Sequence, residues 1–235
     1  MLGPMNILLI DTCFGGCSVA AVWRAGEGVA RSARFELLMR GHAERLTPMI
    51  GEVMEEAPFG FSEIGLIGVT TGPGTFTGQR VGIAAARALA IATGAQVAAL
   101  SSLKVMAHTA AAELGAEVAD GELAVAVDAR RGEIYFQRFA GLQLSTLSEP
   151  ELLTPERAAA SLSDACVIVG SGGAVLEEAM RDVGRSVKAR LATLEPDVRF
   201  FPVDQLMPSP ELPKPLYLRP PDAKPQDGAA LARMS

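Results

Sequence analysis

Two aspartates occupy matching places in the two halves of this 235-residue chain. Asp11 ends an apolar run and is followed four positions later by Gly15, and Asp128 is followed at the same spacing by Gly132. Carboxylate oxygens are ligands that magnesium prefers, so two such aspartates on facing hairpins could hold a magnesium–nucleotide between two lobes. Asp11 and Asp128 are therefore the first candidates for a nucleotide site.

A glycine-rich segment, residues 72–78, reads Gly-Pro-Gly-Thr-Phe-Thr-Gly and leads into an alanine-rich stretch. Glycines permit positive φ and close backbone approach, and a helix N-terminus attracts anions, so the segment could hold a phosphate. Thr75 or Thr77 could instead cap the helix in an ordinary strand-to-helix connection. A phosphate loop would continue with lysine and a hydroxyl residue where this chain has Gln79 and Arg80, so we favour the structural interpretation.

The composition is that of a folded protein with a real core: 49% of the residues are hydrophobic and 20% are charged. Low hydrophobicity with high net charge would indicate disorder, and neither is present. The net charge of −6 provides no basic field for a polyanion, so nucleic acid would be reached only through a partner. Three cysteines, Cys13, Cys17 and Cys166, do not suggest a disulfide framework, and we expect buried, reduced thiols.

No targeting or membrane segment is expected. Residues 1–5 lack the cationic start and apolar stretch of a signal peptide. The longest apolar run, 81–93, is interrupted by Arg87 and is too short to cross a bilayer. We therefore expect a cytoplasmic protein without membrane association.

Apolar runs and helical spacing recur in the same order in both halves. In the first half we expect strands over 6–12, 18–23, 29–37, 64–71 and 96–101, with helices from residue 43, over 79–93 and over 102–114. In the second half we expect strands over 123–127, 134–138, 141–148 and 166–170, with helices opening at 154–155 and following 171–173.

This repetition predicts an α/β fold of two pseudo-duplicated lobes. We expect an N-terminal lobe over 1–103, a C-terminal lobe over 104–207, and an extended proline-rich C-terminal segment over 208–235.

Four motifs, in the same order along nearly the whole chain, resemble the TsaB (YeaZ) family. They are Leu8-Leu-Ile-Asp-Thr12, Thr71-Gly-Pro-Gly-Thr-Phe-Thr-Gly-Gln-Arg-Val-Gly-Ile83, Val127-Asp-Ala-Arg-Arg-Gly-Glu-Ile-Tyr135 and Leu216-Tyr-Leu-Arg219. The resemblance implies lobes of the actin/hexokinase-like (ASKHA) type. It also implies a role in the machinery that forms threonylcarbamoyladenosine in tRNA.

The resemblance also implies that a metal site is lost. The catalytic paralogue, TsaD, carries a His-x-x-x-His pair after the strand equivalent to 96–100, and registering the chains through 71–74 places Ser102 and Met106 there. A hydroxyl and a thioether cannot replace two imidazoles as ligands of such an ion. His108 lacks a partner at helical spacing and is expected to be a partly buried helix residue.

A nucleotide site at the first hairpin is expected to be vestigial. Nucleotide-using members of the superfamily have a hairpin there rich in glycine and hydroxyl residues, whereas residues 12–17 read Thr-Cys-Phe-Gly-Gly-Cys. We expect no cofactor on this chain alone, with ATP or ADP a candidate ligand of an assembled complex. The vestigial site residues would be Asp11, Thr12, Gly72, Gly74, Thr75 and Asp128.

The preferred interpretation is a non-catalytic scaffold that dimerises with a TsaD-like catalytic paralogue, with a TsaE-like ATPase joining the pair and tRNA bound only through the complex. The sequence leaves open whether the isolated chain is a monomer or a homodimer. The alternative is an ATP-binding phosphotransferase or ATPase of the actin-like superfamily. A serine hydrolase is not supported, because Ser101, Ser102 and Ser171 lack a Gly-x-Ser-x-Gly elbow.

The helix over 79–93 has two apolar stripes, and only one is needed to cover a sheet. The resemblance implies pairing through this helix and the one around 46–54, so we expect the stripe of small residues beginning at Gly82 to contact the partner; the alternative is that both stripes are internal, packed under the second lobe. The expected interface is Leu46, Met49, Ile50, Val53, Arg80, Gly82, Ala85, Ala86, Leu89 and Thr93.

Overall fold

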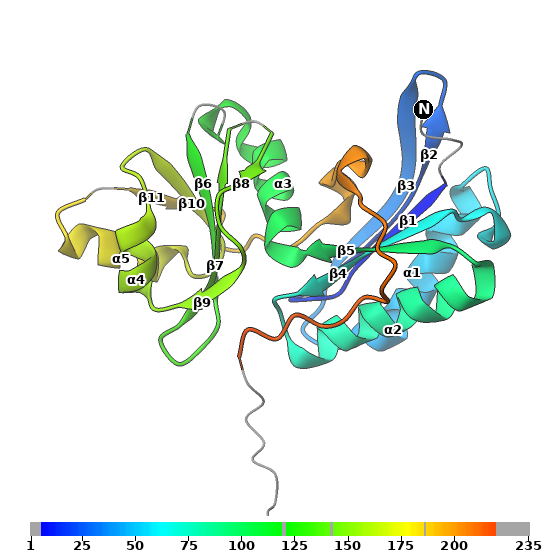
Figure 1. The fold of residues 1–235 in the computed structure, drawn as a ribbon, viewed down its shortest axis with the longest axis horizontal. Coiled ribbons are helices and arrows are strands. Elements are labelled where there is room, and N and C mark those ends of the chain that lie inside the picture. The colour runs from blue at the N-terminus through cyan, green and yellow to red at the C-terminus, as the bar shows by residue number, and fades with distance from the viewer. Residues whose placement is uncertain (1–5, 119–120, 142, 186, 220–235) are drawn as a thin grey trace, which may run out of the picture.

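The structure, a computed structural model, describes residues 6–118, 121–141, 143–185 and 187–219. The chain forms two lobes, each built on one mixed β-sheet flanked by helices (Figure 1). The predicted pair of α/β lobes is confirmed. No helix of these ranges is long and apolar enough to cross a membrane.

The first lobe holds a five-stranded sheet in the order β3-β2-β1-β4-β5. Its strands are β1 (Ile7–Asp11), β2 (Gly16–Ala25), β3 (Gly28–Leu37), β4 (Leu66–Gly72) and β5 (Gln96–Ser101). Its helices are α1 (His42–Glu56) and α2 (Phe76–Thr93), followed by α3 (Ser102–Leu114) between the lobes. The central strands β1 and β4 are buried throughout, which explains their uninterrupted apolar sequences.

The second lobe holds a sheet in the order β11-β10-β6-β7-β8, with β9 paired to β7. Its strands are β6 (Glu122–Asp128), β7 (Ile134–Ala140), β8 (Ser145–Thr146), β9 (Glu151–Leu153), β10 (Cys166–Val169) and β11 (Lys188–Arg190). Its helices are α4 (Pro155–Ser161) and α5 (Gly173–Asp182).

The two sheets share one topology. In each, the first strand pairs antiparallel with the next one and parallel with the strand that follows the first covering helix. β6 therefore corresponds to β1, β7 to β2 and β10 to β4. The predicted duplication is confirmed, while β11, three residues long, was not predicted because it carries no apolar run.

Helix α3 is shared between the lobes. Leu103, Met106 and Ala107 pack in the core of the second sheet, whereas Val105 packs in the core on the far face of the first sheet. The expected boundary between residues 103 and 104 thus falls inside α3. Residues 198–206 return to the first lobe, where Val198 and Phe201 complete the same far-face core.

The inward faces of α1 and α2 form the other core of the first sheet. Leu46, Met49, Ile50, Val53 and Ala86 lie in it, each no more than 6% exposed. The prediction that these five residues are free to contact a partner is wrong, because their side chains are already packed inside the first lobe.

Gly82 is buried for a related reason. A Cβ atom on Gly82 would lie 2.7 Å from Thr12 Oγ1 and 3.5 Å from a methyl group of Val69. The small residues of this stripe therefore let α2 approach its own sheet closely, rather than another protein. Of the other expected contact residues, Ala85, Leu89 and Thr93 are half-buried and Arg80 is exposed.

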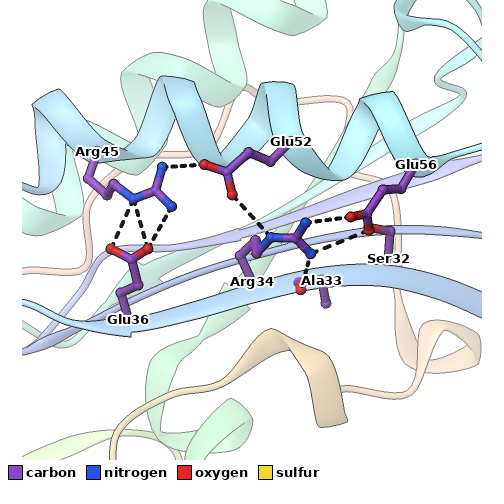
Figure 2. A network of polar contacts seen from close by, with 7 residues as sticks. All are labelled: Ser32, Ala33, Arg34, Glu36, Arg45, Glu52 and Glu56. Carbon is purple, nitrogen blue, oxygen red and sulfur yellow. Dashed lines mark hydrogen bonds and ion pairs between the residues drawn. The ribbon is translucent and has the colours of Figure 1, made fainter.

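A chain of ion pairs fastens α1 to β3, the edge strand (Figure 2). Arg45 contacts Glu36 and Glu52 at 2.6 Å each, and Arg34 contacts Glu52 at 3.0 Å and Glu56 at 2.5 Å. These side chains are partly exposed to solvent, so each ion pair contributes little to stability by itself. Glu52 contacts both arginines and thereby joins the pairs into one network. It covers the edge strand with charge, which disfavours sheet extension by another chain.

Residues 208–219, called the strap below, run in extended form over the first lobe towards the second (Figure 1). The strap's Ser209 N–H donates to the Val97 carbonyl at 2.9 Å, and its Leu216 N–H donates to the Thr71 carbonyl at 2.7 Å. Residues 220–235 of the expected proline-rich segment lie outside the described residues.

Candidate functional site: the cleft between the lobes

A cavity of about 870 Å³ opens between the two lobes and is of a size that holds small molecules. The first lobe lines it with the β1–β2 turn, the glycine-rich loop and the start of α1. The second lobe lines it with the β6–β7 turn and with Ser171 before α5. Both aspartate turns thus border one cleft, as the sequence predicts, but they differ in what fills them.

The glycine-rich loop is pressed against the β1–β2 turn. A Cβ atom on Gly74 would lie 2.4 Å from the Cys13 carbonyl oxygen, and one on Gly78 would lie 2.0 Å from the Thr12 carbonyl oxygen. The Thr75 N–H donates to the Cys13 carbonyl at 2.7 Å. The glycines therefore serve contact between two segments of the chain, which supports the structural interpretation.

Side chains of the protein occupy the N-terminus of α2. Thr75 caps the helix by accepting from the Gly78 N–H at 3.1 Å. Because of this cap, α2 begins at Phe76, three residues before the expected start. The Thr12 hydroxyl donates to the Gly78 carbonyl at 2.6 Å and accepts from the Gly82 N–H at 3.0 Å. Thr12 and Thr75, expected at a vestigial phosphate site, are thus engaged within the lobe.

Asp11 is fully buried beneath the contact between the glycine-rich loop and the β1–β2 turn. Its Oδ1 accepts from the Thr70 hydroxyl at 2.5 Å and from the Cys13 N–H at 3.3 Å, while Oδ2 has no partner in the described structure. Burial raises the pKa of Asp11 to about 7, and the negative charge of Glu195 also raises it. Asp11 does not line the cleft, so its role here is internal.

The three cysteines are free and buried. Burial raises the pKa of the Cys17 thiol to about 12 and that of Cys166 to about 11, and raises the pKa of Cys13 well above its usual value. Thiolate chemistry at neutral pH is therefore disfavoured at all three positions.

Asp128, by contrast, is exposed to the cleft. Its Oδ1 accepts from the Arg130 N–H at 2.7 Å, and its own N–H donates to the Ser171 hydroxyl at 3.1 Å. Arg130 and Arg131 both adopt left-handed backbone conformations, with φ of 66° and 59°. Two consecutive non-glycine residues in this region store strain, so the surrounding structure must hold the turn.

Arg219, at the end of the strap, supplies that restraint. Its guanidinium donates to the carbonyl oxygens of Ala129 at 2.8 Å and Arg130 at 3.2 Å, and it pairs with Glu133 at 2.5 Å. Leu216-Tyr-Leu-Arg219 was a motif of the sequence, but nothing local to it indicated contact with a turn 89 residues away.

Glu195 is the other functional residue that the sequence analysis missed. Its Oε2 accepts from the backbone N–H groups of Gly15 at 2.9 Å and Gly16 at 3.2 Å. Glu195 lies 180 residues from Gly15 and belongs to no motif, so nothing in the sequence predicted its contact with this turn.

Ser102 and Met106, placed by the family resemblance where the catalytic paralogue has its metal-binding histidines, are both buried. The Ser102 hydroxyl donates to the Pro73 carbonyl, and Met106 packs in the core of the second lobe. These side chains do not fit a divalent ion, and the described ranges contain no cluster of three histidine, cysteine, aspartate or glutamate residues arranged to hold one.

His108 is partly buried on α3, as predicted. Its ring packs edge-on against Phe201, with centroids 5.1 Å apart. Burial lowers the pKa of His108 to about 4, and the charge of Lys104 also lowers it. A neutral imidazole packed in this way is a structural residue.

Three aromatic side chains, Phe14, Phe76 and Tyr135, line the cleft. Phe14 of the first lobe and Tyr135 of the second lie 6.3 Å apart between ring centroids. At the start of α2, Phe76 stacks on Tyr217 of the strap at 5.5 Å, and the Arg80 guanidinium lies 3.5 Å over the Phe76 ring. These contacts link the two lobes and fasten the strap to α2.

Comparison with known proteins gives concordant matches. A family model described as TsaD, tRNA N6-adenosine threonylcarbamoyltransferase, matches residues 36–199. TsaB of Escherichia coli, named a tRNA threonylcarbamoyladenosine biosynthesis protein, is 32% identical over 176 residues, which is 72% of each chain. The protein of the same name from Haemophilus influenzae is 31% identical over 185 residues, 74% of this chain and 75% of its own.

Solved structures agree with these sequence matches. YeaZ from Pseudomonas aeruginosa superposes with a TM-score of 0.68 at 32% identity, over 82% of this chain and 86% of that one. A Pseudomonas aeruginosa protein described as similar to peptidase YEAZ superposes with a TM-score of 0.73 at 29% identity, over 92% of this chain and all of that one.

Proposed function

The chain belongs to the TsaB family of tRNA threonylcarbamoyladenosine biosynthesis proteins, and from this premise we propose that it is the non-catalytic partner of a TsaD-like transferase. In this proposal the chain acts in the cytoplasm by dimerising with TsaD. A TsaE-like ATPase joins the pair, and tRNA is bound by the complex rather than by this acidic chain alone.

Ser102 and Met106 carry the main support for a non-catalytic role. The resemblance places them at metal-ligand positions, yet one is hydrogen-bonded to the glycine-rich loop and the other belongs to a core. A hydroxyl that is already bonded and a thioether are poor substitutes for two imidazole ligands. We therefore propose that the isolated chain carries no metal and no cofactor, and that ATP or ADP enters only with the assembled complex.

The exposed faces of α1 and α2 are the proposed pairing surface. The two helices lie side by side on the outer face of the first sheet (Figure 1). On α2, Arg80, Ala84, Ala88 and Ile91 are exposed, and Ile91 is 80% exposed. Small residues on this stripe would let a partner helix approach to the roughly 8–10 Å typical of packed helices.

Pairing is tested by mixing the purified chain with its TsaD-like paralogue, with and without ATP, and measuring complex mass by light scattering. Ala88→Arg places a long charged side chain on the proposed surface and is expected to weaken pairing at least tenfold. Ala174→Arg, on an equally exposed position of α5 in the other lobe, is the matched control and should pair normally. Normal pairing of Ala88→Arg would contradict the surface.

Ala86→Tyr separates the two faces of α2. Because Ala86 is fully buried, the ring is expected to overpack the core and lower stability by about 1–3 kcal/mol. A folded Ala86→Tyr protein of unchanged melting temperature that fails to pair would instead restore the sequence-based assignment.

The cleft of about 870 Å³ with Asp128 exposed in it favours one competing function, an ATP-binding phosphotransferase or ATPase. Titration calorimetry of the isolated chain with Mg·ATP distinguishes the two. A dissociation constant tighter than about 10 μM, near −7 kcal/mol, would favour the enzyme.

A further inference from the structure

The β1–β2 turn points two consecutive backbone N–H groups at one oxygen atom. The N–H groups of Gly15 and Gly16 lie 2.9 and 3.2 Å from Oε2 of Glu195. Successive N–H groups that converge on one point form a concave anion-binding nest. The turn is therefore built to receive negative charge, and the charge that it receives is one of the chain's own carboxylates.

Both glycines are needed for this approach. A Cβ atom on Gly15 would lie 2.9 Å from Oε1 of Glu195, and one on Gly16 would lie 3.2 Å from its Cβ. A Cβ atom on Gly16 would also lie 3.1 Å from Cε2 of Phe35, so a larger residue at either position would crowd the Glu195 side chain where it meets the turn.

The negative charge of this carboxylate is only partly compensated in the turn. Burial raises the pKa of Glu195, and the two N–H groups only partly oppose this effect. The described residues give Glu195 no ion pair, and the buried Asp11 lies near enough for their charges to repel. A half-buried carboxylate without a cationic partner is costly, so another anion could compete with it.

The neighbouring chain holds Glu195 in place. The Ser18 hydroxyl donates to the Pro196 carbonyl at 3.4 Å and accepts from the Val198 N–H at 3.2 Å. Glu195 and Gly15 both line the cleft between the lobes, so an anion from solvent could reach the turn if the carboxylate withdrew.

We propose that the Gly15–Gly16 turn is an oxyanion site occupied by the protein's own Glu195, and that withdrawing this carboxylate opens the site to phosphate. Glu195 then acts as an internal anion that closes the first lobe's side of the cleft. The proposal does not depend on the pairing function, because it concerns the isolated chain.

The test is a titration of the full-length, ¹⁵N-labelled chain with inorganic phosphate at constant ionic strength, following the amide resonances of Gly15 and Gly16. In the wild type these resonances should move little. In Glu195→Ala they should move with a half-saturation concentration at least tenfold lower. Glu44→Ala, which removes an exposed carboxylate from the same cleft, is the matched control and should behave as wild type.

Glu195→Gln keeps the side chain's shape and an accepting oxygen, so it protects the test against loosening of residues 194–198. It should fold as wild type and bind phosphate between the wild type and Glu195→Ala. The proposal is overturned if both folded variants respond to phosphate as the wild type does. It is equally overturned if phosphate shifts resonances elsewhere while Gly15 and Gly16 stay unmoved.

Discussion

At the end of β1, Asp11 is enclosed by the glycine-rich loop, and the backbone N–H groups of the following turn donate to Glu195. At the end of β6, Asp128 faces the open cleft on a strained turn that Arg219 holds from outside. The two strands occupy equivalent positions in sheets of one topology. Duplication thus preserved the sheet and the placement of each aspartate, while the segments packed on the turns decided which one meets solvent.

The difference between the turns arises from how closely the neighbouring segments pack over each aspartate. The first turn is filled by the loop before α2 and by the linker around Glu195. The second turn is bonded to Ser171 of the loop before α5 through the Asp128 N–H and to the strap through Arg219, and these contacts leave the Asp128 side chain exposed. A closed first turn and an open second one are expected of a scaffold more than of an enzyme that clamps a nucleotide between both.

Asp11→Asn tests the closed turn most strongly. Because the folded protein raises the pKa of Asp11 from 3.8 to about 7, the folded state holds the proton more tightly than the unfolded state. Stability should therefore fall as pH rises from about 4 to about 7, by about 4 kcal/mol in all, and stay low above that. Asparagine keeps the acceptor for Thr70 and Cys13 without the charge.

Denaturant unfolding at pH 5 and pH 8 measures this effect. Asp11→Asn should be more stable than the wild type at pH 8 and should lose most of the downward slope. Equal slopes in the two proteins would show that the first aspartate is no more enclosed than the second.

Gly78→Ala tests the contact that closes the first turn. The added Cβ would lie 2.0 Å from the Thr12 carbonyl oxygen, a backbone atom that cannot move aside, so we expect a loss of about 3 kcal/mol in unfolding free energy. Gly51→Ala in α1 is the matched control, since its Cβ meets nothing within 4 Å and should raise stability by up to about 1 kcal/mol. Similar unfolding midpoints for both variants would contradict the close packing.

Arg219→Ala should loosen the second turn and leave the first unchanged. Loss of its bonds to Ala129, Arg130 and Glu133 is expected to lower stability by about 1–2 kcal/mol and to speed amide hydrogen exchange over 129–133. Lys214→Ala removes an exposed cation from the same strap and should change neither. Unaltered exchange in Arg219→Ala would mean that the turn keeps its strained shape unaided.

Asp128→Asn should have the smallest effect. The side chain is exposed, and asparagine can still accept from the Arg130 N–H, so the unfolding free energy should stay within about 0.5 kcal/mol of the wild type. Calorimetric melting measures it. A larger loss would show that the second turn also depends on its aspartate, which would make the two turns alike.

Most strands and helices of both lobes could be predicted from local sequence, but the three-residue strands β9 and β11 were not predicted, and β8 (Ser145–Thr146) is much shorter than the strand expected over 141–148. Apolar runs such as residues 6–11 predict buried central strands, and the spacing of Leu46, Met49 and Val53 predicts a helix with one inward face. Asp–Gly spacing at both turns, together with the repeated order of elements, was enough to predict the duplicated topology.

Periodicity could not decide which stripe of α2 faces the sheet. Both stripes are apolar, because Gly82 and Ala86 lie on one and Ala84 and Ala88 on the other. The choice depends on how closely the helix approaches Thr12 and the first sheet, a distance that is absent from the sequence of the helix itself.

The sequence by itself determined most of the strands and helices, their duplicated order and the family, since each depends on neighbouring residues or on motifs read in order. Only the tertiary structure decided that Asp11 is buried, that Glu195 occupies the Gly15–Gly16 turn and that Arg219 holds the opposite one. The contacts of Glu195 and Arg219 join residues 86 to 180 positions apart. Burial and hydrogen bonding at such separations depend on how whole helices and strands pack, and local residue patterns do not contain that information.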